Sequence, residues 1–211
     1  GEWVRKLVGG VSALFRERQD VFVAGDHLIY PVEGNNQISI APDLYVVFGR
    51  PKGHRHSYLL WREEYIFPQV VVEIMSPSNT MREMVRKRRL YRQHGAEEFY
   101  IYDPHRLRFQ AFIRTNNTLR AIPQSRLNGF RSPRLGLIFE LTPTGLQVRF
   151  PNGDLIVDYE EVFAKLEQEQ ARAEQAEREK EQAIQRLILA EAERARLHER
   201  LRALGIDPAT I

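Results

Sequence analysis

The sequence predicts a mixed α/β fold, in which helices flank a mixed sheet and a long helix follows at the C-terminal end. Three observations support this. Short apolar runs, such as residues 44–48 and 69–75, have the length of strands and no polar alternation, which is typical of strands covered on both faces. Segments with helical spacing of apolar residues precede and follow these runs. From residue 160 to residue 204 the chain is rich in Ala, Glu, Arg and Gln and lacks Pro and Gly.

The first half of the chain is predicted to contain one helix and three extended segments. Apolar residues three and four positions apart indicate an amphipathic helix at the start: Val4, Leu7, Val8, Val11, Leu14 and Phe15. Residues 21–24, 28–30 and 44–48 are predicted to be extended. Residues 33–37 form a turn, because Gly and Asn tolerate the positive φ that turns need. Residues 49–57 are rich in Arg, Lys and His and are predicted to form a basic, mobile loop.

The second half begins with the segment that most resembles a central strand, residues 69–75, which is β-branched and bounded by prolines. A helix follows, because Thr80 and Glu83 have the spacing of a capping box and Gly95 ends the apolar pattern. Hairpin signals occur at Asn116-Asn117 and Asn152-Gly153. Further strands are predicted near residues 99–102, 108–113, 135–141, 146–150 and 155–157.

We therefore expect one domain at residues 1–159, a long charged helix at 160–204 and a tail at 205–211. Rows of Leu and Ala can be drawn along the helix at heptad spacing, but Glu169, Lys180 and Arg194 interrupt them. Two interpretations remain open at this point. The helix is either a weak coiled coil that pairs two copies of the chain or a single solvated helix held by Glu–Arg pairs.

Composition excludes several classes of protein. With 43% hydrophobic and 28% charged residues the chain is typical of a globular protein, and no apolar run reaches the roughly 18 residues of a membrane span. The absence of cysteine excludes disulfides and thiolate metal sites and is compatible with the cytoplasm. No secretory signal is visible, and Gly1 in place of Met suggests that upstream residues are missing. The net charge of +3 permits binding to a polyanion without requiring it.

Asp43, Glu73 and Lys87 are the candidate catalytic residues. Asp43 directly precedes one apolar run, Glu73 lies near the end of another, and Lys87 lies on the following helix at the border of its apolar arc. Two carboxylates at the ends of adjacent strands can share a divalent ion, and an amine beside them can orient water or offset charge on phosphorus. If the three side chains meet, they are sufficient to hydrolyse a phosphodiester.

A structural interpretation of each residue is also open. Glu73 and Lys87 would look the same in the sequence if they formed only an ion pair, and Asp43 follows Pro42 as in many turns. Asp26 is an accessory candidate for the metal, although a turn role fits it as well. Ser76, in the tight connection after Glu73, is an accessory candidate for contacting a phosphate oxygen.

Four segments of the chain resemble one large bacterial family of unassigned function, the restriction-endonuclease-like proteins of the Uma2/DUF820 type. The family lies within the PD-(D/E)XK phosphodiesterase superfamily. The segments are Ala-Pro-Asp43, Val-Val-Glu73-Ile-Met-Ser-Pro-Ser78, Lys87-Arg-Arg-Leu-Tyr91, and Gly95-Ala-Glu-Glu-Phe-Tyr-Ile-Tyr-Asp103-Pro104. They arrive in the family's order and spacing, and the similarity covers roughly residues 4–157.

The resemblance implies a restriction-endonuclease-like core with Mg²⁺, or Mn²⁺ in its place, held by Asp43 and Glu73. The lysine that the superfamily usually carries two residues after the glutamate is Met75 here, so the resemblance assigns its role to Lys87. The implied activity is metal-dependent hydrolysis of DNA. We expect a homodimer, because cutting both strands of a duplex favours a symmetric pair of sites. Two alternatives remain: a catalytically silent member that serves in binding or oligomerisation, and a nuclease for RNA or for branched or single-stranded DNA.

Overall fold

The computed structural model describes residues 1–204, apart from the side chain of residue 161. The chain divides into two compact units, Gly1–Tyr159 (unit 1) and a second unit that begins at Glu160, where the composition changes. Each is described by itself. The predicted tail, residues 205–211, lies outside the described residues.

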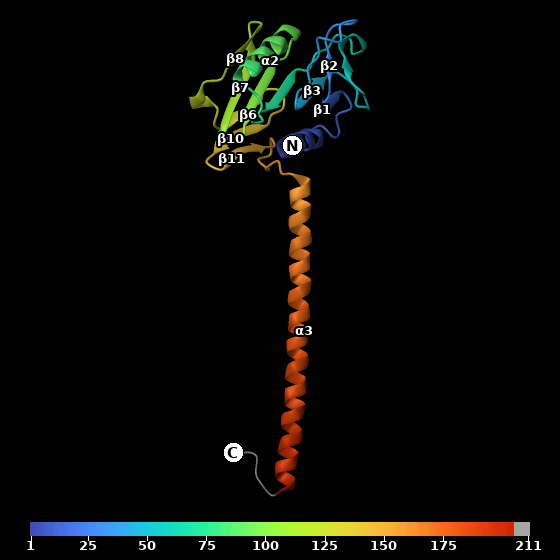
Figure 1. Cartoon of the computed structure of the whole chain (residues 1–211), viewed down its shortest axis with the longest axis vertical. Coiled ribbons are helices and arrows are strands. Elements are labelled where there is room, and N and C mark those ends of the chain that lie inside the picture. The colour runs from blue at the N-terminus through green and yellow to red at the C-terminus, as the bar shows by residue number, and fades with distance from the viewer. Residues whose placement is uncertain (205–211) are drawn as a thin grey trace. The chain divides into compact units, whose positions relative to one another are not determined.

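A six-stranded mixed sheet forms the centre of unit 1 (Figure 1). Strands β5 and β6 pair in parallel and are joined through helix α2 (Met81–His94), whereas the other neighbours pair antiparallel. The mixed α/β fold expected from the sequence is therefore confirmed. The strands lie in the order β1 (Val21–Ala24), β3 (Leu44–Phe48), β5 (Val70–Ile74), β6 (Glu98–Asp103), β7 (Arg108–Thr115) and β8 (Thr118–Ala121).

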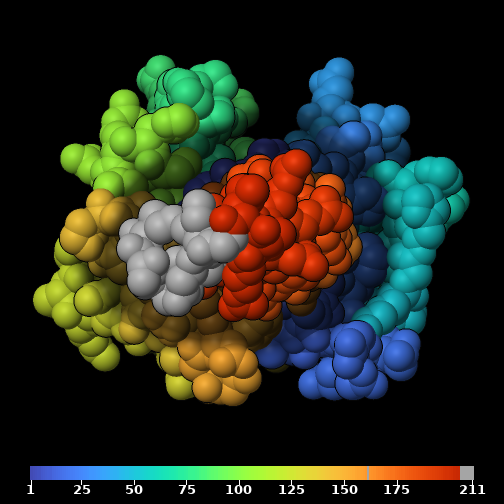
Figure 2. Space-filling view, turned by 90° about the horizontal axis from the view of Figure 1, so that it is seen from below, coloured from blue at the N-terminus to red at the C-terminus, as the bar shows by residue number. Residues whose placement is uncertain are grey.

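Both faces of this sheet are covered. Helix α1 (Glu2–Leu14) and a small sheet pack on one face, and α2 packs on the other together with a parallel strand pair. In Figure 2 the N-terminal segments (blue to cyan) and the segments of β6 to β8 (green to yellow) occupy opposite sides of unit 1, as the strand order requires. The small sheet contains β9 (Phe130–Arg131), β10 (Ile138–Thr142) and β11 (Gly145–Arg149), and the parallel pair contains β2 (Ile29–Tyr30) and β4 (Tyr58–Leu59). The two 3₁₀ helices are η1 (Leu60–Arg62) and η2 (Gln124–Arg126).

Local sequence signals explain where α2 begins and ends. The hydroxyl oxygen of Thr80 accepts a hydrogen bond from the backbone N–H of Glu83 at 3.2 Å, which caps the first turn. Gly95 ends the helix in the left-handed conformation with φ 103°, which a residue with a side chain adopts only with strain. The predicted helix and both of its boundaries are confirmed.

Two expectations, a strand at residues 155–157 and a mobile loop at residues 49–57, need correction. Residues 155–157 form no strand, because only the single bridge between Leu155 and Arg149 links them to the small sheet. The basic loop at 49–57 is tied into the fold rather than free. Arg50 and Arg55 both donate to the buried carboxylate of Glu63, at 2.9 and 2.6 Å. Although burial pushes the pKa of Glu63 upward, the hydrogen bonds from these arginines bring it below its usual range.

Helix α3 (Tyr159–Ala203) accounts for most of the second unit and confirms the predicted long helix. Apolar side chains along it are exposed in the single chain, among them Ile184, Leu187 and Ile188. None of the helices formed by residues 1–204 combines the length and the apolar character needed to cross a bilayer.

Candidate active site

Asp43 and Glu73 meet at one edge of the central sheet. Asp43 directly precedes β3 and Glu73 lies near the end of β5, so the antiparallel pairing of these strands brings both to the same edge. The register pairs Leu44 with Val72, and its next step places Asp43 opposite Glu73. Residues in such facing positions have Cβ atoms about 4.5–5.5 Å apart. Both side chains lie on the sheet face that α2 covers.

Glu73 is the centre of the site and is only 2% exposed. The Nζ of Lys87 lies 2.7 Å from its Oε2, and the hydroxyl of Tyr91 donates to its Oε1. Lys87 and Tyr91 reach the same carboxylate because residues four positions apart share one face of a helix. The ammonium group of Lys87 therefore points to Glu73, and its side chain is 17% exposed.

Burial controls the ionisation of both carboxyl groups. It raises the pKa of Glu73 to about 7, against the opposing effects of Lys87 and Tyr91. Burial also raises the pKa of Asp43, while the Ile74 N–H and Lys87 act in the opposite direction. The negative charge of Asp43 also raises the pKa of Glu73, and the negative charge of Asp26 raises that of Asp43. The ionised pair is thus accessible from about neutral pH upward.

Asp43 offers the more accessible of the two carboxylates. Its Oδ2 accepts a hydrogen bond from the backbone N–H of Ile74 at 2.7 Å, which fixes the side chain against β5. Within the part of the chain that the structure describes, its Oδ1 accepts no hydrogen bond. Asp43 is half-buried, so this oxygen is available for a ligand.

Asp26 lies beside Asp43, whereas Ser76 lies apart from it. The β1–β3 register pairs Ala24 with Tyr45, which places Asp26 next to Asp43, and its backbone N–H donates to the Pro42 carbonyl at 3.1 Å. Its φ of 53° is that of a turn residue, in agreement with the turn role. The hydroxyl of Ser76 shares hydrogen bonds with Ser78 and Asn79 in the loop before α2.

Gly25 sets the position of Asp43, because the backbone of β1 approaches Asp43 too closely for a side chain. A Cβ at residue 25 would overlap the carbonyl oxygen of Asp43 and would lie 2.6 Å from Cγ2 of Val8. We expect Gly25→Ala to lower the free energy of unfolding by about 1–3 kcal/mol, the usual cost of overpacking. Urea denaturation measures the change.

Gly9→Ala is the matched control for this experiment. Its Cβ would meet only Cδ2 of Tyr159, at 4.0 Å, and alanine is the better helix former. We therefore expect the control to be neutral or stabilising. Equal stability of the two variants would contradict the close approach at Gly25.

The donor set fits a hard divalent cation. Mg²⁺ is commonly held by one or two carboxylates, with water and substrate phosphate oxygens completing its shell. Asp43 and Glu73 match that pattern, although an ion would have to replace Lys87 or Tyr91 at one oxygen of Glu73. Among residues 1–204 no group of three or more His, Cys, Asp or Glu side chains could hold a metal ion. The site therefore suits an ion that is bound partly by the substrate.

A hollow of about 400 Å³ opens beside Lys87. Its walls are residues 37–41, which lead to Asp43, and one side of α2 with Arg86, Lys87 and Leu90. The hollow gives solvent access to Lys87, whereas neither Asp43 nor Glu73 lines it. Of the basic helix residues, Arg88 lies over the Phe112 ring at 4.6 Å, whereas Arg86 and Arg89 are exposed.

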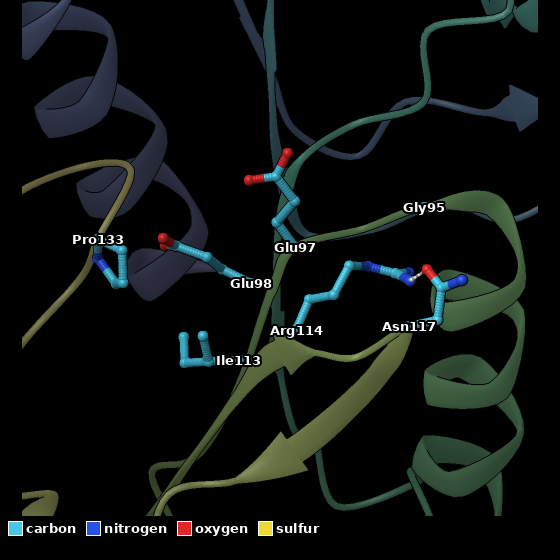
Figure 3. A pocket seen from close by; sticks show the side chains of 7 residues that line it. All are labelled: Gly95, Glu97, Glu98, Ile113, Arg114, Asn117 and Pro133. Atoms are coloured by element: carbon cyan, nitrogen blue, oxygen red, sulfur yellow. Dashed lines mark hydrogen bonds between the residues drawn. The ribbon is translucent and has the colours of Figure 1, made fainter.

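A second hollow, of about 460 Å³, lies at the other end of β6 and belongs to the scaffold (Figure 3). Glu97 pairs with Arg134, and the buried carboxylate of Glu98 accepts hydrogen bonds from Tyr100, from Ser132 and from the backbone of Arg134. Arg114 donates to the carbonyls of Ala96 and Arg92 and to Asn117. The charged side chains that line this hollow, Glu97, Glu98 and Arg114, are therefore engaged within the fold.

Tyr91 is the site residue that the sequence analysis did not single out. Its position four residues after Lys87 on an amphipathic helix was the available signal. The hydroxyl group became informative only when Glu73 was seen to lie beneath it, because a buried tyrosine usually needs a hydrogen-bond partner.

Comparisons with known proteins found one family and solved structures to which the chain is similar. The profile of the family Uma2, described as "Putative restriction endonuclease", matches residues 2–149. Among solved structures, the chain is similar to "a putative nuclease belonging to DUF820" from Anabaena variabilis ATCC 29413, with 12% sequence identity and a TM-score of 0.47. That similarity covers 64% of this chain and 73% of the other. A search of curated proteins found no match.

Proposed function

This chain belongs to the Uma2 family, and from that premise we propose that it is a Mg²⁺-dependent endonuclease that hydrolyses DNA, in which Mn²⁺ can replace Mg²⁺. The observation that carries the proposal is the convergence of Asp43, Glu73 and Lys87 at one solvent-accessible edge of the sheet. A structural ion pair alone would not need the second carboxylate opposite Glu73.

Each residue has a distinct role in this proposal. Asp43 and Glu73 would hold the ion, which would supply polarisation of the phosphate and a lower pKa for its bound water. Lys87 stands 2.7 Å from Glu73 and beside the hollow, so its ammonium group can orient the water or offset negative charge on the phosphate. Tyr91 and the backbone of Ile74 fix the directions of the two carboxylates.

Cleavage of supercoiled plasmid by the full chain tests the proposal. We expect nicked or linear product with Mg²⁺ or Mn²⁺, none with EDTA, and a strong loss with Glu73→Gln, which keeps the volume of the side chain but not its charge. Asp154→Asn, in an exposed turn, is the matched control and should cleave normally. Absence of metal-dependent cleavage, or cleavage undiminished by Glu73→Gln, would reject the proposal.

The rival is a catalytically silent protein that uses the nuclease fold for binding. It is favoured by one observation: both oxygens of Glu73 already have donors within the chain. The rival predicts no uptake of Mg²⁺ or Mn²⁺ at Asp43 and Glu73 by titration calorimetry, even with a DNA oligonucleotide present. A panel of RNA, single-stranded and branched substrates decides the class of nucleic acid.

We further propose that the protein is cytoplasmic. We also propose that it acts as a homodimer, since cutting both strands of a duplex favours a symmetric pair of sites. The exposed apolar residues of α3 support pairing through this helix as a coiled coil. Sedimentation equilibrium of the full chain, compared with Leu187→Glu, measures the association.

A further inference from the structure

We propose that the cavity between the first turn of α2 and strands β6 and β7 binds a second phosphate of the nucleic acid, a few nucleotides away from the one that is cleaved. This inference rests on the proposed function, because it extends the same site. The cavity has a volume of about 340 Å³, within the range of about 300–1,000 Å³ typical of ligand sites.

The cavity lies next to Asp43 and Glu73 along the direction in which the strands of the sheet are paired. In the sheet, Glu73 pairs with Ile101 of β6, and Ile101 pairs with Gln110 of β7. Ile101 and Gln110 both line the cavity. Strands lie about 4.8 Å apart, so the cavity begins one strand away from Glu73 and Gln110 lies roughly 10 Å from it. That span corresponds to about three steps of 3.4 Å along a nucleic acid.

Charge changes sign along this edge of the sheet. Asp26, Asp43 and Glu73 place carboxylates on the β1, β3 and β5 side, where a cation fits. On the β7 side Arg108 follows the same face two residues before Gln110 and lines the cavity. The one carboxylate there, Asp103, is buried and already accepts hydrogen bonds from the backbone of His105 and from Arg106. The two halves therefore suit a metal ion and a phosphate respectively.

Arg108 and Gln110 have donors that the fold does not use. Within residues 1–204 neither side chain has a hydrogen-bond or ion-pair partner. Arg108 is exposed and Gln110 is half-buried, so a guanidinium and an amide face the cavity together. Thr80 already caps the N-terminus of α2, so the donors offered to the phosphate are those of Arg108 and Gln110. Guanidinium and amide groups are common donors to phosphate oxygens, and they fix register without reading sequence.

Binding in EDTA tests this inference separately from cleavage. Fluorescence anisotropy follows a labelled 20-mer, single-stranded or duplex, bound to the full chain and to Arg108→Ala. We expect the variant to bind about tenfold more weakly, as for one lost charge-assisted contact, and the slope of log K against log salt to fall in magnitude by about 0.9. Circular dichroism should show an unchanged fold, because the side chain of Arg108 has no hydrogen-bond or ion-pair partner among residues 1–204.

Arg120→Ala is the matched control. It removes the same charge from an exposed arginine of the same sheet, but Arg120 pairs with Ile113 and so lies on the face away from α2. We expect less than a twofold change. Equal losses for Arg108→Ala and Arg120→Ala, no loss for Arg108→Ala, or no binding by the unchanged protein would each overturn the inference.

The outcomes also separate this inference from the proposed activity. Arg108-dependent binding without cleavage in any metal would leave the phosphate site standing and reject the catalytic proposal. Metal-dependent cleavage with the same KM in Arg108→Ala would do the reverse. If both hold, Arg108→Ala should raise KM and leave kcat nearly unchanged, since Arg108 does not touch the reacting groups.

Discussion

Replacing Lys87 with methionine is expected to make the free energy of unfolding of the metal-free protein decrease as the pH rises above about 7. In the unchanged protein the ionisation of Glu73 no longer changes the free energy of unfolding above that pH. Burial raises the pKa of Glu73 to about 7, so the folded state takes up a proton that the unfolded state has lost above its own pKa of about 4.3. A raised carboxyl pKa stabilises the fold below the unfolded pKa, and that contribution is lost as pH rises to about 7.

Removing Lys87 raises the pH at which this contribution to stability is fully lost. The attraction of Lys87 is what holds the pKa of Glu73 down to about 7 against burial, and without it the pKa is higher. The difference in unfolding free energy between Lys87→Met and the unchanged protein should then widen by up to about 1.4 kcal/mol per pH unit from pH 7 to pH 9. Below pH 6 the difference should be constant.

Urea denaturation in EDTA from pH 5 to pH 9 measures this difference. Arg86→Met, one residue earlier and exposed, is the control and should show a constant difference throughout. The double variant Glu73→Gln/Lys87→Met should also lose the slope, because the carboxyl group of Glu73 is no longer there to titrate. A pH-independent effect of Lys87→Met would show that the pair of Lys87 and Glu73 does not set the ionisation of the site.

Replacing Asp43 with asparagine is expected to reduce metal-dependent cleavage on the order of 10³-fold while leaving the fold intact. The amide oxygen of asparagine can still accept the hydrogen bond from the Ile74 N–H, so stability should change by less than about 1 kcal/mol. The second oxygen is replaced by an uncharged NH2 group, however, so the ion loses a ligand and the negative charge of the side chain. A Lewis acid contributes several kcal/mol to such a reaction, and about 4 kcal/mol corresponds to three orders of magnitude in rate.

Initial rates of plasmid cleavage over a range of Mg²⁺ concentrations measure the loss. Asp154→Asn is the control, because it makes the same chemical change in an exposed turn. Partial recovery of Asp43→Asn at high Mg²⁺ would identify weakened metal binding as the cause. Cleavage at the normal rate would mean that Asp43 serves only to join β3 to β5.

Much of this architecture could be predicted from local sequence. The strand at residues 44–48, the helix between Thr80 and Gly95 and the long final helix all depend on signals within a few residues of one another. The turn at Asn116-Asn117, where both residues have positive φ, is of the same kind. Where pairing depended on a distant partner, prediction was weaker. Residues 155–157 have a strand's composition but form only one bridge.

The sequence by itself determined which residue types the site contains. It shows an aspartate before one buried strand, a glutamate near the end of another and a lysine on an amphipathic helix. Only the tertiary structure decided how they are used. The antiparallel register sets Asp43 opposite Glu73, Tyr91 completes the contacts of Glu73, and Glu63 engages Arg50 and Arg55.

The physical reason is distance along the chain. The carboxyl groups of the site lie thirty residues apart in the sequence. Arg108 and Gln110 belong to β7, two strands away from Glu73 in the sheet, and lie on the same face. No interaction between neighbours in the sequence fixes such a meeting. The packing of α2 and the register of the six strands fix it, because a shift of one residue would turn every one of these side chains to the opposite face.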